Sequence, residues 1–90
     1  MSRVVWKYKL LPGVNTFDVP DGSRFVAVAP WQPGDEGPAV WIERERLGES
    51  GPRLRLVAIG TGHDIPPGAA HLGSAWCGSF MWHVYELGPA

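Results

Sequence analysis

Glycine and proline divide this sequence into short segments, and that division limits the fold more than any other feature. The chain has 12 glycines and nine prolines among 90 residues, and most of them separate short runs of aliphatic and aromatic side chains. No run shows apolar residues at the ~3.6-residue spacing of an amphipathic helix. The runs instead alternate, or are apolar throughout, as short β-strands do.

Seven segments fit this description. Residues 3–10 show the pattern clearly, with Trp6 and Tyr8 on one face and Lys7 on the other. Residues 24–29 are apolar on both faces, which predicts a central strand rather than an edge strand. Strands are predicted at residues 3–10, 14–19, 24–29, 39–46, 53–59, 72–76 and 80–87, the last two as a closing hairpin.

The segment between the fifth and sixth predicted strands, residues 60–68, is expected to be irregular, since its two consecutive prolines resist both helix and ladder. At most one short helical turn is expected near residues 68–71. We therefore predict an all-β fold, a small antiparallel sandwich or barrel of about six to seven short strands with little or no helix. The length allows one domain, residues 1–90.

Charge and composition exclude some partners. The formal net charge is −1, so the broad basic surface that binds duplex nucleic acid is not expected. Cys77 is the only cysteine, so no intramolecular disulfide can form, which fits a reducing compartment. The N-terminal residues lack a signal-like apolar run and no window approaches the ~18 apolar residues of a membrane span, so we expect a cytoplasmic protein without a membrane partner.

The most tightly specified polar cluster follows the fifth predicted strand, at Gly60-Thr61-Gly62-His63-Asp64. Its glycines let the backbone approach a ligand closely, successive amides can form a concave anion site, and Thr61 and His63 would add side-chain donors. The segment does not open a helix and no Lys-Ser or Lys-Thr follows, so it is not a phosphate-binding loop of the Walker type. The structural alternative is a strand exit that needs a positive φ, with His63 capping a neighbouring carbonyl.

Metal binding and catalysis are less well supported. The spacings of His63, His71 and His83 match no common zinc motif, and we expect no metal and no cofactor. Ser74 or Ser79 with His63 and Asp64 lacks a nucleophile elbow. Cys77 with His83 lacks a helix N-terminus to activate the thiol. We expect the protein not to be an enzyme.

Aromatic residues point to binding. Five tryptophans exceed what a core of this size needs, and although most are expected in the core or in a subunit interface, Trp31 stands in a Pro/Gly loop where a base could stack, gaining ~1–3 kcal/mol. Arg24 or Arg55, or alternatively Arg53, could pair with a phosphate. So many large aromatics in a short chain also predict an exposed apolar patch, and hence a homodimer or higher homo-oligomer.

Several short motifs spread over nearly the whole chain carry a likeness to a known family. They are Trp6-Lys7-Tyr8-Lys9-Leu10, Pro20-Asp21-Gly22 before Phe25-Val26-Ala27-Val28, Gln32, Val40-Trp41-Ile42, Gly60-Thr61-Gly62-His63, Gly73 and Trp82-His83-Val84-Tyr85-Glu86. With these the chain resembles a small uncharacterised domain family of actinobacteria and their phages. Cys77-Gly78-Ser79 departs from the Gly-Gly that relatives often carry there, which affects only the hairpin geometry. The resemblance implies a phage-type accessory protein and brings no established activity.

Two functions follow as expectations. The first is a non-catalytic protein that binds and sequesters a small ligand, with a nucleotide signal of host immunity as a sensible candidate. Thr61, Gly62, His63 and Asp64 would orient its polar groups, Trp31 would stack on its base, and Arg24 and Arg55 would pair with phosphate. The alternative is a protein-binding module, a virion or host-interaction accessory that acts through an aromatic surface or an open strand edge.

Overall fold

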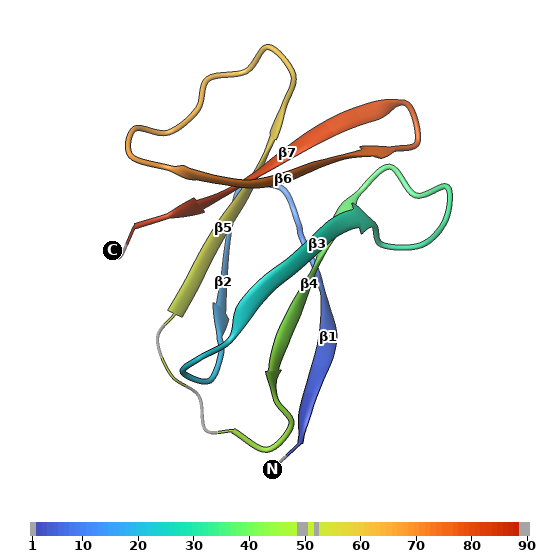
Figure 1. Ribbon diagram of the computed structural model, residues 1–90. Helices are drawn as coiled ribbons and strands as arrows, with labels where there is room; N and C mark the ends of the chain where they lie inside the picture. Colours follow the sequence, from blue (N-terminus) through green and yellow to red (C-terminus); the bar gives the residue numbers. More distant parts are fainter. Residues whose placement is uncertain (1, 49–50, 52, 89–90) are drawn as a thin grey trace.

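Two antiparallel sheets packed face to face make up the fold in the computed structural model, which describes residues 2–48, 51 and 53–88 (Figure 1). The three-stranded sheet has the order β1-β4-β3 and the four-stranded sheet the order β2-β5-β7-β6. The prediction of an all-β antiparallel sandwich is confirmed, and the sheets do not close into a barrel. The strands are β1 (Arg3–Lys9), β2 (Val14–Asp18), β3 (Arg24–Pro30), β4 (Pro38–Glu45), β5 (Arg53–Gly60), β6 (Ala70–Cys77) and β7 (Phe80–Leu87).

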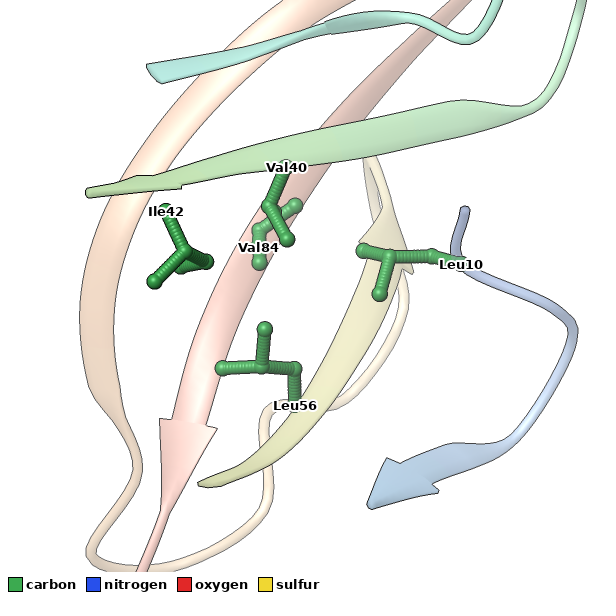
Figure 2. Close-up of a cluster of buried hydrophobic side chains, with 5 residues drawn as sticks. All are labelled: Leu10, Val40, Ile42, Leu56 and Val84. Carbon is green, nitrogen blue, oxygen red and sulfur yellow. The ribbon is translucent and has the colours of Figure 1, made fainter. Parts of the chain in front are cut away.

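The core lies between the two sheets and is built by the predicted alternation. Val40 and Ile42 of β4 point toward Leu56 of β5 and Val84 of β7, and Leu10 closes one end just after β1 (Figure 2). All five side chains are at most 4% exposed. Burial of each such side chain stabilises the fold by about 1.5–3 kcal/mol relative to leaving it in water.

The prediction that residues 24–29 form a central strand is wrong, because β3 is an edge of its sheet and β4 is central. The register of β3 against β4 shifts between Phe25 and Ala27, which makes Val26 an extra residue in a β-bulge. The bulge breaks the alternation, so Phe25 and Val28 both pack against the core. That is why both faces of this segment look apolar in the sequence.

Close packing of β3 on β6 explains the glycine at position 73. A Cβ atom at Gly73 would lie 3.0 Å from a Val28 methyl and 3.3 Å from the Phe25 ring. Those contacts are tighter than a side chain tolerates without movement of its neighbours, so Gly73 lets the two sheets approach each other here.

The closing hairpin of β6 and β7 extends past the end of β5. β5 ends at Gly60, which pairs with Trp82, whereas β7 begins at Phe80, opposite Cys77 of β6. The two turn residues are Gly78 and Ser79, and Gly78 takes a φ of 61° that favours glycine. The predicted hairpin is confirmed, with β6 two residues longer at its start. Its tip therefore projects with no β5 residue beside it.

A crossover loop, residues 61–69, joins β5 to β6 across β7, because β7 lies between those two strands in the sheet. The loop arches on the side away from the three-stranded sheet (Figure 1). Its two turns are closed by the amides of His63 and Ala69, which donate to the carbonyls of Gly60 and Pro66. The helical turn allowed for near residues 68–71 does not form, and no helix able to cross a bilayer occurs in the described residues.

Candidate functional site

A pocket of about 650 Å³ lies where β5 ends and the hairpin tip continues. One wall is the start of the crossover loop, and the other is the tip of the hairpin. The lining residues are Gly60, Thr61, His63, Trp76, Ser79, Phe80, Met81 and Trp82. Most of this lining is aromatic or apolar, with three polar side chains at its edge and no Arg, Lys, Asp or Glu side chain among the lining residues.

The strand register explains why a hollow forms here. Because β5 stops opposite Trp82, the neighbouring Met81 and Phe80 have a strand partner on the β6 side only. Gly60 also leaves room: a Cβ atom there would touch His63 Nδ1 at 3.5 Å and the Trp82 ring at 3.8 Å. The end of β5 therefore contributes only backbone to the pocket, between the crossover loop and the hairpin tip.

The aromatic wall is held in place from outside the hairpin. Trp82 Nε1 donates a hydrogen bond of 2.8 Å to the Glu36 carbonyl in the β3–β4 loop. The ring centroids of Phe80 and Trp82 lie 6.3 Å apart at an interplanar angle of 44°. Phe80 remains 50% exposed and Trp76 65% exposed, so two large ring surfaces are open to a ligand.

The turn at residues 60–63 confirms the structural role of its second glycine. Gly62 has a φ of 89°, as the third residue of a type II turn requires. The His63 amide is already bonded to the Gly60 carbonyl at 3.1 Å, so one donor of the expected anion-binding turn is used. The hydrogen bonds among the described residues include none from the His63 imidazole, and the predicted cap on a carbonyl does not form. Thr61 and His63 line the pocket, whereas Gly62 and Asp64 lie beside it on the exposed loop.

A chain of hydrogen-bonded side chains runs from the pocket across the outer face of the hairpin. Thr61 Oγ1 lies 2.9 Å from His83 Nε2, and Ser74 Oγ lies 2.7 Å from His83 Nδ1. Ser74 Oγ also lies 2.9 Å from His71 Nε2. His83, in the middle of β7, therefore has a hydroxyl group on each ring nitrogen.

Sequence reasoning did not find the role of Ser74 and His71. Once β6 and β7 are paired as a hairpin, the register places Ser74 opposite His83, and this could have been read from the two-residue turn. The inclusion of His71 could not, because it depends on a register shift between His71 and Gly73 that puts His71 and Ser74 on the same face.

The other predicted ligand residues lie elsewhere. Trp31 is on the outer face of the three-stranded sheet, where Lys7 Nζ stands 4.2 Å from its ring centroid and donates to its carbonyl. Arg24 pairs with Glu43 on that sheet at 3.0 Å. Arg55 is on the outer face of the four-stranded sheet and donates to the Gly88 carbonyl. The structure brings none of these three into the pocket with Thr61 and His63.

Two alternative chemistries can be compared with this geometry. The described residues bring no three His, Cys, Asp or Glu side chains together around a metal position. Ser74 is bonded to His71 and His83 rather than to His63 and Asp64. Cys77 is fully buried, and that burial raises the pKa of its thiol, the opposite of what a nucleophile needs.

Comparison with known proteins gives a family and no activity. The whole chain, residues 1–90, matches the model of a domain of unknown function, DUF7352. The chain belongs to this family, which fits the expected uncharacterised domain family. No curated protein and no solved structure matches it significantly.

Proposed function

We propose that this member of DUF7352 is a non-catalytic binding protein that captures a small ligand bearing a flat ring in the pocket between the crossover loop and the hairpin tip. The pocket itself carries the proposal. Its volume of about 650 Å³ falls within the range of about 300–1,000 Å³ typical of small-molecule sites. Its lining combines apolar surface with a few polar groups, the usual composition of such sites.

The ring surfaces favour a planar ligand. Phe80 and Trp76 are the exposed aromatic members of the lining, and a ring stacked on an aromatic side chain gains about 1–3 kcal/mol per base in nucleic-acid-binding proteins. Thr61, His63 and Ser79 stand at the rim, where they can bond to substituents of the ring. A nucleobase has the size and the polar edge that this arrangement fits.

The charge of the pocket limits how much phosphate it would hold. The lining contains no Arg or Lys, and Arg24 and Arg55 are bonded on distant faces. We therefore favour a nucleobase, a nucleoside, or a nucleotide whose phosphate faces solvent near His63. Capture is favoured over turnover, because the hydrogen bonds of His83 among the described residues go to two hydroxyl groups and to no carboxylate, so Ser74 lacks the oriented base of a triad.

The proposal extends to a biological role, for which the likeness to actinobacterial and phage domains is the support. A phage accessory protein of this kind would act in the host cytoplasm and hold a nucleotide immune signal without degrading it. Self-association as a homodimer belongs to the same proposal.

A melting experiment with ligand recovery tests the proposal. Purified protein is mixed with a panel of nucleobases, nucleosides and linear and cyclic nucleotides, and the shift of Tm is recorded. A ligand at a hundredfold excess over its Kd adds about 2.7 kcal/mol of stability, which raises Tm on the order of 10 °C for a domain of this size. The bound compound is then released by heat and identified. Intact recovery supports capture, a changed compound would show an enzyme, and no shift with any compound contradicts the proposal.

One observation favours the protein-binding alternative. Trp76, at 65% exposed, lies on β6, which is an edge strand of its sheet. Phe80, at 50% exposed, lies at the hairpin tip opposite Cys77. An exposed aromatic next to an open strand edge is typical of an interface. If no compound of the panel shifts Tm, this second function is favoured.

A further inference from the structure

Four strands lie at the edges of the two sheets, and their sequences differ in how well they resist pairing with another chain. β1 and β3 are the edges of the three-stranded sheet, and β2 and β6 are those of the four-stranded sheet. An edge strand presents unpaired N–H and C=O groups, and natural proteins block such edges with charged side chains, proline, bulges or short strands.

Three of the edges carry these features. β1 has three basic residues among its seven. β2 is only five residues long and ends in Asp18. β3 begins with Arg24, ends with Pro30 and has its bulge between them. Pairing of another strand along any of these edges is therefore disfavoured.

β6 is the exception. Its eight residues, Ala70–Cys77, include no Lys, Arg, Asp, Glu or Pro. Its register shift lies between His71 and Gly73, so the stretch from Gly73 to Cys77 pairs regularly with β7. The Trp76 side chain near the end of this stretch is 65% exposed. β6 is thus the edge best suited to receive another strand.

The hairpin turn determines which backbone groups of β6 point outward. Cys77 and Phe80 flank the two turn residues, and the first of these, a glycine, has the positive φ (61°) that a type II′ turn requires there. Cys77 and Phe80 are therefore the hydrogen-bonded pair that closes the hairpin. Because such pairs alternate along an antiparallel ladder, Ala75 bonds to β7, whereas Ser74 and Trp76 turn their N–H and C=O groups to the open edge.

A second copy of this chain fits the open edge. Antiparallel pairing about a two-fold axis at Ala75 places Ser74 of each copy opposite Trp76 of the other. Each of these two pairs exchanges two N–H···O=C bonds, so both outward-facing residues of both copies are satisfied. An axis at Ser74 or at Trp76 would instead bring the bulge at Leu72 or the turn at Gly78 into the ladder. The axis at Ala75 therefore gives the most complete pairing, and each tryptophan meets a small serine with no charged residue of β6 between the copies.

We propose that β6 strands of two copies pair antiparallel about Ala75, so that the four-stranded sheet continues from one copy into the other. This inference rests on the homodimer in the proposed function and names the surface that forms it. Trp76 faces the outer side of the sheet with Met81, whereas Phe80 lies on the inner side with Val84. Phe80 therefore stays open to a ligand when Trp76 meets the partner subunit.

Sedimentation velocity over a series of protein concentrations measures the dimer. One strand pair with two tryptophans is small beside stable interfaces, which bury about 1,200–2,000 Å², so the dimer is expected to dissociate on dilution. Trp76→Lys removes the exposed ring and places a charge on the edge, and it should weaken dimerisation at least about tenfold, as the loss of a tryptophan anchor does.

Val5→Lys is the matched control for this variant. Val5 is also an exposed apolar residue (49%) and also lies on an edge strand, β1, so its replacement should leave dimerisation unchanged. Equal weakening by the two variants, or a monomer at every concentration, would overturn the proposal.

A cysteine on the two-fold axis tests the register. Residues that face each other in a non-hydrogen-bonded pair have Cα atoms about 4.5 Å apart, within the range of about 4.4–6.8 Å found in disulfides. Ala75→Cys, in a Cys77→Ala background that removes the native thiol, should therefore crosslink two copies under mild oxidation. Ser74→Cys in the same background is the control, since its two copies would lie diagonally at about 7–8 Å. Equal crosslinking of both, or none through position 75, would overturn the register.

Hydrogen exchange in the native protein gives a readout that needs no substitution. The amides of Ser74 and Trp76 should exchange more slowly as protein concentration rises, whereas the Ala75 amide, already bonded within the hairpin, should change less. Unchanged exchange of Ser74 and Trp76 under conditions where sedimentation shows a dimer would contradict this interface.

Ligand binding is followed separately, which keeps the two proposals apart. Naphthalene, a flat bicyclic probe for the pocket, and the nucleotide panel are tested by the shift of Tm. A Tm shift without a crosslink through position 75 would leave the pocket intact and overturn the paired edge. A crosslink without any ligand-induced shift would contradict the pocket and leave the dimer interface intact.

Discussion

The middle and the start of β7 carry apolar residues in opposite surroundings. Val84, near the middle of the strand, has no exposed surface, whereas Phe80 at its start is 50% exposed. Val84 pairs with Ala58 of β5 on one side and Gly73 of β6 on the other. Phe80 pairs with Cys77 of β6 and has no partner on β5. The difference between core and pocket thus arises from where β5 ends, not from the kind of side chain.

The comparison teaches how so small a sandwich makes room for a site. Where β7 lies between two strands and under the other sheet, each apolar side chain contributes to folding. Where the hairpin extends past β5, an apolar side chain such as Phe80 has no protein surface packed against it. A ligand that covers this side chain would gain the free energy of burying its apolar surface. Binding and folding should therefore respond to different substitutions.

The largest effect on stability is expected in the core between the two sheets. Leu56→Ala removes a fully buried side chain of the core and should lower the free energy of unfolding by about 2–5 kcal/mol, measured by urea denaturation. Leu47→Ala is the control, because Leu47 is 91% exposed and its loss should change stability by no more than about 0.5 kcal/mol. Equal losses of unfolding free energy from the two substitutions would contradict the distinction between buried and exposed apolar residues.

At the start of β7, where Phe80 is exposed, a substitution should affect ligand binding more than stability. Phe80→Ala is expected to leave the free energy of unfolding within about 1 kcal/mol of the parent, since half of the ring is already in water, yet to weaken the binding of naphthalene about tenfold by removal of one stacking surface. Leu11→Ala, an exposed apolar position (59%) that does not line the pocket, should change neither. Strong destabilisation by Phe80→Ala would show that the tip belongs to the core.

His63→Ala should also weaken ligand binding with little change in stability, and by a smaller factor than Phe80→Ala. The His63 side chain lines the pocket and lacks a hydrogen-bond partner in the described part of the chain, so its loss should reduce the affinity for a recovered panel ligand about threefold, at the low end of a single hydrogen bond. The Tm of the free protein should stay nearly unchanged. A large drop in Tm would identify His63 as a structural residue.

The smallest effect concerns the outer face of the three-stranded sheet, remote from either end of β7. Arg3 and then Arg24 hydrogen-bond to the Glu43 carboxylate and hold its pKa below the ordinary value. Because the folded-state pKa is lowered, Glu43 stabilises the fold above the unfolded pKa of about 4.3, and this contribution is lost as pH falls through the lower folded value. Glu43→Gln should be slightly less stable than the parent at pH 7 and should approach it in acid. A difference that persists at pH 2 would show another origin.

Most of the fold could be predicted from local patterns. The alternation of residues 39–46 separates Val40 and Ile42 from Trp41, and glycine and proline mark the turns. The edge position of β3 could not be predicted, because a bulge at Val26 imitates the two-sided apolar pattern of a central strand.

Only the part of the site that consecutive residues form could be predicted from the sequence. The turn at residues 60–63 could be identified from its glycines, and Thr61 and His63 do line a pocket. The aromatic wall of Phe80 and Trp82 depends on the length of β5 relative to β7, which the sequence does not specify. Trp31 was expected at the ligand because it stands in a loop, but Lys7 covers its ring, a contact between positions 24 residues apart.

Chemical-shift mapping tests the central claim most directly. Titration of ¹⁵N-labelled protein with naphthalene, or with the panel compound that raises Tm most, locates the contact on the chain. The account predicts that the perturbed amides cluster at residues 60–63 and 76–82, with those around Trp31, Arg24 and Arg55 unchanged. Perturbations centred on the outer face of the three-stranded sheet, or none at saturating probe, would contradict it.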